Sequence, residues 1–268
     1  MNCVEIMGGL GNQLFQYTFS KYLQKLGIKN VVLRKDFFAI DFSQNEDMTK
    51  REFLLDKYNV RYIAVTGERT YGQYCDENDF GCEKAAELDN ILYEGYWQDI
   101  RFYDTVKDEI KEELGLKQKF IDESMKAVEN EMASCNSVAI HIRRSDYLTQ
   151  ANAQIFEQLT EDYYASAVSI IERYTRQKPV LYIFSDDPKY AAENMKDFMG
   201  CRSVIMPPRE AYQDMYLMSR AKHNIIANST FSWWGATLNS NPDNITVAPL
   251  RWMKGRTVNL YHKDWVTL

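Results

Sequence analysis

The sequence has no long hydrophobic run. None of its 268 residues belongs to a stretch of about 18 consecutive apolar residues, the length that a membrane-spanning helix requires. The N-terminus enters a predicted strand at residue 2 and shows no basic segment followed by an apolar core, which argues against a secretory signal. We therefore expect a cytoplasmic protein without a transmembrane segment.

Cysteine and basic charge are also scarce. The five cysteines are odd in number and lack the spacing of metal ligands, which indicates reduced thiols and neither a zinc site nor a disulfide scaffold. Acidic residues outnumber basic ones by 38 to 32, so the net charge is −6 and the pI about 5.3. This balance argues against binding to nucleic acid or to an anionic membrane. A phosphate-bearing ligand would need a local group of cations.

The second half of the chain shows a regular alternation of strands and helices. Apolar runs predict the strands, and helical spacing with Thr160 and Asp187 as N-caps predicts the helices. This alternation indicates a parallel sheet covered on both faces, and such sheets bind ligands at the carboxyl ends of their strands. The predicted strands are 137–142, 180–184, 203–206, 224–227 and 245–248, and the predicted helices are 161–174, 188–200, 212–219 and 232–239.

The first half is less regular, and a domain junction is expected at 129–136. We therefore predict an N-terminal domain at 1–133 and a C-terminal domain at 134–268. Two Rossmann-like α/β domains facing across a cleft form the GT-B architecture, which is the predicted fold. The first half predicts strands at 2–6 and 31–33, helices at 12–25, 102–114 and 120–133, and a polar irregular stretch at 41–90.

Four small polar residues follow the strand at 224–227, where the next helix should begin. They are Asn228, Ser229, Thr230 and Ser232. Unpaired N–H groups at a helix start form an anion site, to which hydroxyl groups can add donors. Taken alone, this segment is more typical of an N-capped core helix.

A second polar segment follows the strand at 137–142, which ends in His141 and leads into Arg143, Arg144 and Asp146. Consecutive arginines are poor core residues, because guanidinium groups are rarely buried without partners. Their fork geometry matches phosphate oxygens in bidentate fashion. The segment therefore predicts phosphate binding, with His141 either on the same ligand or in the core.

A glycine loop follows the first predicted strand. It lacks the third glycine of the dinucleotide fingerprint, and no Gly-Lys-Ser/Thr follows, so it is neither that fingerprint nor a P-loop. Gly9 and Gly11 would let another group approach the backbone closely. Asn12 and Gln13 offer amide hydrogen bonds at the same place. A tight strand-to-helix turn is the alternative interpretation.

Asp186 and Asp187 follow the predicted strand at 180–184. Because parallel strands end at one edge, these aspartates, the arginines and the segment 228–232 should share one site. Paired acidic residues after a strand can hold Mg²⁺ or Mn²⁺ on a nucleotide diphosphate, which would indicate a GT-A enzyme. However, two arginines already supply positive charge, and Asp187 precedes Pro188 as a helix N-cap. We therefore predict no metal site.

Together these motifs resemble glycosyltransferase family 11, the α-1,2-fucosyltransferases, in their bacterial form. The His-x-Arg-Arg-x-Asp and Asn-Ser-Thr-Phe-Ser-Trp-Trp-Gly segments are the most specific, and the resemblance covers nearly the whole chain. Two departures are Ser145, where the family usually has glycine, and Thr237, where a tryptophan is common. The matching segments are 8–17, 51–56, 95–98, 141–147, 184–187, 214–219 and 223–235.

The resemblance implies an inverting transfer of L-fucose from GDP-β-L-fucose to the 2-hydroxyl of a terminal β-galactoside, without metal or cofactor. It implies that Arg143 stabilises the departing β-phosphate with support from Arg144, and that Asn12 contacts the sugar or its bridging oxygen. One of Asp186 and Asp187 would accept hydrogen bonds from the guanine, and His141 would contact the same base. The hydroxyls of Ser229, Thr230 and Ser232 would hold the phosphates.

The general base stays unassigned. The α-1,6 relatives have a glutamate ten residues after the motif histidine, where this chain has Ala151. Asp146 is close enough in sequence to act as the base, or it braces one of the arginines. Two alternatives to the fucosyltransferase are another GDP-sugar-dependent GT-B glycosyltransferase and a nucleotide-sugar-binding protein without catalytic activity.

Overall fold

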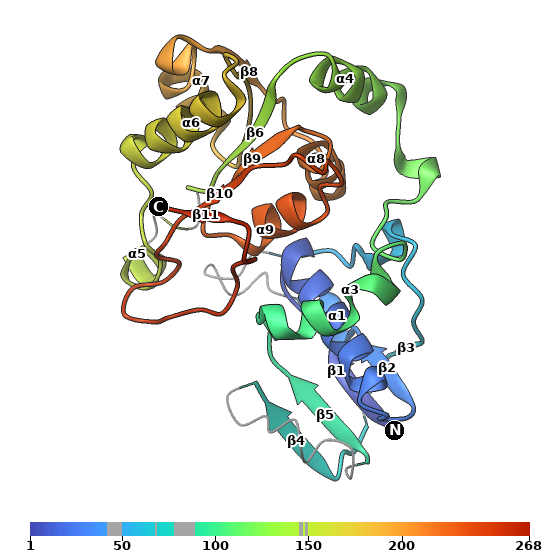
Figure 1. Ribbon diagram of the computed structural model, residues 1–268. Helices are drawn as coiled ribbons and strands as arrows, with labels where there is room; N and C mark the ends of the chain where they lie inside the picture. The colour runs from blue at the N-terminus through green and yellow to red at the C-terminus, as the bar shows by residue number, and fades with distance from the viewer. Residues whose placement is uncertain (42–49, 68, 78–88, 145–146, 148–149) are drawn as a thin grey trace. The chain divides into compact units, whose positions relative to one another are not determined.

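The chain folds into two compact units, Met1–Lys117 and Gln118–Leu268. The computed structural model describes residues 1–41, 50–67, 69–77, 89–144, 147 and 150–268. Each unit contains one parallel sheet with helices, which confirms the α/β class and the two Rossmann-like domains (Figure 1). The boundary precedes helix α4 (Glu123–Ala133), whereas the sequence places it after this helix. The reason is that α4 packs against α8 (Ala211–Met218) of the second unit.

The sheet of the first unit has five parallel strands in the order β3-β2-β1-β5-β4. The stretch at 41–90, predicted to be irregular, supplies both edge strands within its described part. They escaped prediction because β3 has two residues and β4 is largely exposed, so neither shows a buried apolar run. The strands are β1 (Asn2–Glu5), β2 (Val31–Arg34), β3 (Ala64–Val65), β4 (Gln73–Asp76) and β5 (Ile91–Glu94).

Helices α1 (Leu10–Lys25) and α3 (Ile100–Ile110) of the first unit pack against each other. The ring of Phe19 stacks on that of Trp97, with the centroids 3.8 Å apart and the planes 1° from parallel. Phe102 meets the same phenylalanine edge-on at 5.0 Å. These rings anchor the segment after β5, which includes Trp97, to the core of the unit.

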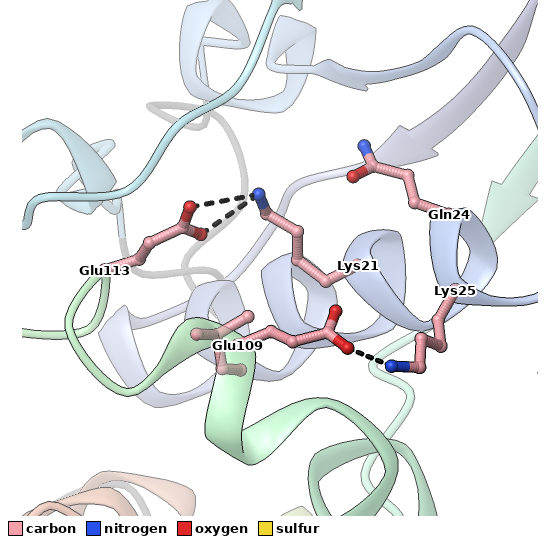
Figure 2. Close-up of a pocket in the computed structure, with 6 residues that line it drawn as sticks. Lys21, Gln24, Lys25, Glu109 and Glu113 are labelled. Carbon is pink, nitrogen blue, oxygen red and sulfur yellow. Dashed lines mark hydrogen bonds and ion pairs between the residues drawn. The ribbon is translucent and has the colours of Figure 1, made fainter.

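A shallow depression of about 400 Å³ lies along α1 and α3 (Figure 2). Lys21 Nζ lies 3.0 Å from Glu113 Oε2, and Lys25 pairs with Glu109. The hydroxyl of Tyr17 also donates to Glu113. Since both lysines of the depression pair with glutamates, we interpret it as a helix junction held by ion pairs.

The sheet of the second unit has six parallel strands in the order β11-β10-β9-β6-β7-β8. All five strands predicted from the sequence of this half are present, with ends shifted by only a few residues. The edge strand β11 was not predicted. The strands are β6 (Ser137–Ile142), β7 (Val180–Ser185), β8 (Arg202–Ile205), β9 (His223–Ile225), β10 (Thr246–Ala248) and β11 (Val266–Thr267).

Helices α6 (Glu161–Thr175) and α7 (Pro188–Asn194) cover one face of this sheet. They pack on alternate residues of β6, Val138, Ile140 and Ile142. Helices α4 and α8 lie on the other side (Figure 1). His141, between the alternate core residues, therefore points away from α6 and toward that other side.

Several helix predictions need correction. Helix α3 ends at Ile110, before the predicted 114, and α4 begins at Glu123, after the predicted 120. Helix α7 ends at Asn194 and not at the predicted 200. Gly200 (φ +69°) instead closes a separate short turn at Phe198–Gly200. The buried stripe of α6 excludes Tyr174, whose side chain is 72% exposed near the end of the helix. Helix α9 (Thr230–Thr237) begins before the predicted 232, and α5 (Gln150–Ile155) was not predicted. In the described ranges, no helix has the length and apolar character needed to span a bilayer.

Candidate functional site

The carboxyl ends of three strands meet at one edge of the second unit's sheet. Strand β6 pairs in parallel with β7 on one side and with β9 on the other. Arg143 and Arg144 directly follow β6, and Asp186 and Asp187 directly follow β7. The turn into α9 follows β9. This edge is where parallel α/β sheets bind ligands.

Each arginine is held by an aspartate from the neighbouring strand. Arg143 Nη1 lies 3.0 Å from Asp186 Oδ2, and the other oxygen of Asp186 accepts from the Arg144 backbone N–H at 2.9 Å. Arg144 Nε lies 3.5 Å from Asp187 Oδ2, and its guanidinium carbon lies 3.6 Å from the Tyr190 ring centroid. These four charged side chains are 20–32% exposed, so both guanidinium groups are oriented and still reach solvent.

The aspartates thus have partners within the unit. Besides its ion pair, Asp187 caps α7 by accepting from the Tyr190 backbone N–H at 3.0 Å, as the sequence predicts. The geometry assigns both aspartates to orienting the arginines and the helix start. Contact of Asp186 or Asp187 with a guanine base stays a prediction.

His141 is an uncharged, buried imidazole. It is 4% exposed, and burial together with the positive charge of Arg143 lowers its pKa to about 3. Its Nδ1 makes no hydrogen bond to any described group, and its ring lies 5.3 Å from that of Phe231 on α9. At neutral pH this histidine therefore cannot serve as a general acid, but it can offer a neutral nitrogen to a ligand.

Of the four polar residues at the start of α9, two hold the turn by hydrogen bonds and two stand at the first positions of the helix. Asn228 Nδ2 donates to the carbonyl oxygens of Glu157 (2.9 Å) and Trp252 (2.8 Å). Ser232 Oγ is fully buried and donates to the Ser229 carbonyl oxygen at 3.1 Å. Asn228 and Ser232 therefore hold the turn, and Ser229 and Thr230 stand at the helix start itself.

Tyr147 links the loops after β6 and β9, a role that sequence reasoning missed. Its hydroxyl donates to the Asn228 carbonyl oxygen at 2.8 Å, and the Arg143 guanidinium carbon lies 5.8 Å from its ring centroid. The ring stacks on Phe156 at 4.2 Å. The candidate base Asp146 lies outside the described residues.

Asp214 is a second residue whose role the sequence did not reveal. It lies in the first turn of α8, the helix that follows β8 and its loop. Its Oδ1 is buried without a hydrogen-bond partner among the described residues. Burial, opposed by the charge of Arg209, raises its pKa to about 7. A buried carboxyl group of this kind often marks a functional site.

Replacing Asp214 with asparagine should stabilise the protein at pH 8. The carboxyl group ionises at a lower pH in the unfolded chain than in the fold, so wild-type stability falls as the pH rises from about 4 to 7. We expect Asp214→Asn to raise the free energy of unfolding at pH 8 by about 1–2 kcal/mol, and to change it little at pH 4. Urea unfolding at both pH values measures this. An equal change at the two values would contradict the buried carboxylate.

The glycine loop of the first unit is held by its own side chains. Gly8 has φ +76°, and a Cβ atom there would lie 2.8 Å from Asn12 Nδ2, so glycine is required. Gln13 Nε2 donates to the carbonyl oxygens of Gly8 (3.0 Å) and Glu52 (2.8 Å), which gives this amide a structural role. Gly11 is buried in the first turn of α1, whereas a Cβ atom on Gly9 would meet nothing within 4 Å.

Asn12 lies beside this loop in the first turn of α1. Its Oδ1 accepts a hydrogen bond from Gln98 Nε2 at 3.1 Å, which orients the amide and turns Nδ2 away from Gln98.

In the ranges that the structure describes, no three His, Cys, Asp or Glu side chains gather as metal ligands would. Arg143 and Arg144 bring positive charge to the edge of the second sheet.

Comparison with known proteins places these features in a family. The glycosyl transferase family 11 model matches residues 1–268. The Escherichia coli O-antigen biosynthesis glycosyltransferase WbnK is 32% identical, over 98% of this chain and 99% of its own length. The E. coli alpha-1,2-colitosyltransferase is 28% identical, over 98% and 97%.

Among solved structures, a glycosyl transferase family 9 protein from Veillonella parvula DSM 2008 shares the fold with a TM-score of 0.50. It is 10% identical, and the match covers all of this chain and 86% of the other. That likeness concerns the fold alone, whereas the family model and the sequence relatives concern the whole chain. The protein is therefore a glycosyltransferase and belongs to glycosyl transferase family 11.

Proposed function

We propose that this glycosyltransferase is an inverting α-1,2-fucosyltransferase. It moves L-fucose from GDP-β-L-fucose to the 2-hydroxyl group of a terminal β-galactoside. The observation that carries the proposal is the pair Arg143 and Arg144, each oriented by an aspartate at the end of the adjacent strand. Such a pair suits the diphosphate of a nucleotide sugar.

The arginines serve the departure of GDP. The acceptor oxygen attacks the anomeric carbon from the face opposite the nucleotide, and the bond from that carbon to the β-phosphate oxygen breaks. Negative charge then grows on the β-phosphate, where Arg143 stabilises it and lowers the barrier. Arg144 positions the diphosphate, and the hydroxyl groups of Ser229 and Thr230 at the start of α9 add donors. The proton of the acceptor hydroxyl group goes to a base that stays unassigned.

Guanine recognition suits Asp214 better than Asp186 or Asp187. Asp186 Oδ2 and Asp214 Oδ1 are both buried without a hydrogen-bond partner among the described residues. Asp186 is nevertheless ion-paired with Arg143, and Asp187 with Arg144, so Asp214 is the aspartate left to meet the base. A carboxylate can accept from both the N1–H and the 2-amino group of guanine, and His141 of the same unit offers a neutral nitrogen. The variant Asp214→Asn, expected to be more stable at pH 8, should therefore bind GDP about tenfold or more weakly.

The glycine loop of the first unit is proposed to contact the transferred sugar. The amide of Asn12 is oriented by Gln98 and would donate to the fucose or to its bridging oxygen. Gly9 supports this role. A Cβ atom there would meet nothing within 4 Å, so packing inside the fold does not account for the glycine. A residue without a side chain lets a sugar approach the backbone closely.

One relative is the alpha-1,2-colitosyltransferase, so GDP-colitose is the second candidate donor. Colitose is L-fucose without its 3-hydroxyl group. A site that hydrogen-bonds this hydroxyl would reject the colitosyl donor strongly, and an apolar site would discriminate little. Donor choice therefore separates the two candidates.

A donor panel with and without a chelator tests the proposal. We expect transfer from GDP-fucose to lactose to exceed transfer from GDP-colitose and GDP-mannose, and to survive excess EDTA because arginines supply the positive charge. Preference for GDP-colitose would select the second candidate. Loss of activity in EDTA with recovery in Mn²⁺ or Mg²⁺ would contradict the role given to the arginines. Donor binding without turnover would indicate a non-catalytic binding protein.

A further inference from the structure

Tyr96 is an exposed aromatic ring beside the glycine loop of the first unit. It follows β5 at the carboxyl edge of the sheet, and 40% of its surface is exposed. A Cβ atom built on Gly8 would lie 3.3 Å from Cε1 of this ring. The ring thus lies against the loop that precedes Asn12.

The backbone around Tyr96 is fixed by Glu77 and by the buried Trp97. Glu77 Oε2 accepts from the backbone N–H groups of Tyr96 and Trp97, both at 2.8 Å. Trp97 adopts the left-handed φ of +55° and is buried in its stack on Phe19. A left-handed backbone at a bulky residue is rare and persists only where the surrounding contacts impose it. The fold therefore holds the Tyr96 ring at the surface.

The groups around this ring suit a sugar. Gln98 Nε2 donates to Asn12 Oδ1 at 3.1 Å, and burial together with the charge of Glu77, opposed by that of Arg51, raises the pKa of the Tyr96 hydroxyl group. A β-galactoside presents a face of C–H groups that packs on an aromatic ring, and its hydroxyl groups bond to amides and charged groups. An aromatic ring beside a few oriented polar groups is the usual composition of such a site.

We propose that Tyr96 is the ring on which the acceptor galactoside stacks, and that the segment 95–98 forms an acceptor subsite beside Asn12. The proposal rests on the proposed function, in which Asn12 contacts the donor fucose. A galactoside stacked next to Asn12 would lie beside that sugar. Glu77 and Trp97 act as positioning residues, because they reach the acceptor only through Tyr96.

Kinetics of two Tyr96 variants test the subsite. We expect Tyr96→Ala to raise the KM for lactose about tenfold while the KM for GDP-fucose stays within about twofold, since only the acceptor loses its ring. Tyr96→Phe keeps the ring and should keep the wild-type KM for lactose within about threefold. The matched control is Tyr174→Ala, which removes a tyrosine that is 72% exposed on α6.

The outcomes separate the subsite from other roles of the ring. An unchanged KM for lactose in Tyr96→Ala, or an equal rise of the two KM values, would overturn the subsite and assign Tyr96 to the glycine loop or the donor. Wild-type protein inactive with GDP-fucose would contradict the proposed function instead. In that case saturation-transfer NMR of lactose with GDP present still decides: loss of the signal in Tyr96→Ala alone supports the subsite, and equal signals overturn it.

Discussion

Arg143→Ala should lower kcat/KM for fucose transfer about 10²–10³-fold. In the proposed reaction this guanidinium meets the charge that grows on the β-phosphate, and removing one such preorganised donor has an effect of this size. GDP affinity should fall much less, because the contact strengthens in the transition state. Steady-state kinetics and calorimetry of GDP binding measure the two effects.

Two further variants make this result interpretable. Arg143→Lys keeps the charge without the fork that pairs with Asp186, and should recover part of the lost rate. Arg173→Ala removes an exposed arginine from the last turn of α6 and should leave the rate unchanged. A folded Arg143→Ala protein with activity within a few fold of wild type would contradict the role given to this residue.

Asn12→Ala should separate catalysis from nucleotide binding. Asn12 belongs to the first unit, and the proposed nucleotide contacts belong to the second. We expect GDP affinity to stay within about 1 kcal/mol of wild type, the value of one neutral hydrogen bond. We expect kcat to fall about 10–100-fold, because a contact to the reacting end of the donor acts mainly in the transition state.

The control for this variant is Gln24→Ala, which removes an exposed amide from the same helix. It should change neither kcat nor GDP affinity. An Asn12→Ala protein that lost GDP affinity and kept kcat would assign the glycine loop to the nucleotide. The division of roles between the two units would then be reversed.

Continuous burial made some strands predictable but not all, because β5 is buried at three of its four residues and was not predicted. Strand β6 is buried at all six residues and has the bounds predicted for it. Strand β4 is mostly exposed, and its residues 73–76 show no apolar run, so nothing local distinguishes it from a loop. It forms because it pairs with β5, residue by residue, and the paired residues lie 18 positions apart, as Gln73 and Ile91 do.

The sequence predicted which residue types stand at the strand ends of the site. It did not predict the directions in which their side chains point. The sequence places Arg143 and Asp186 after neighbouring strands, and the ion pair between them follows from the parallel pairing. It does not reveal that Ser232 turns inward to a backbone carbonyl group. Asp214 begins one of the segments that match the family, but the sequence does not reveal its raised pKa, which arises from burial by the rest of the unit.

The most direct test of the account is the structure of the product formed from GDP-fucose and lactose, determined by NMR. The account predicts one new fucosyl residue, α-linked, on the 2-hydroxyl group of the terminal galactose. A β-linked product would contradict inversion, and attachment at another hydroxyl group would contradict the α-1,2 assignment. GDP-fucose hydrolysed or bound without any transfer to the galactoside would contradict the proposed function as a whole.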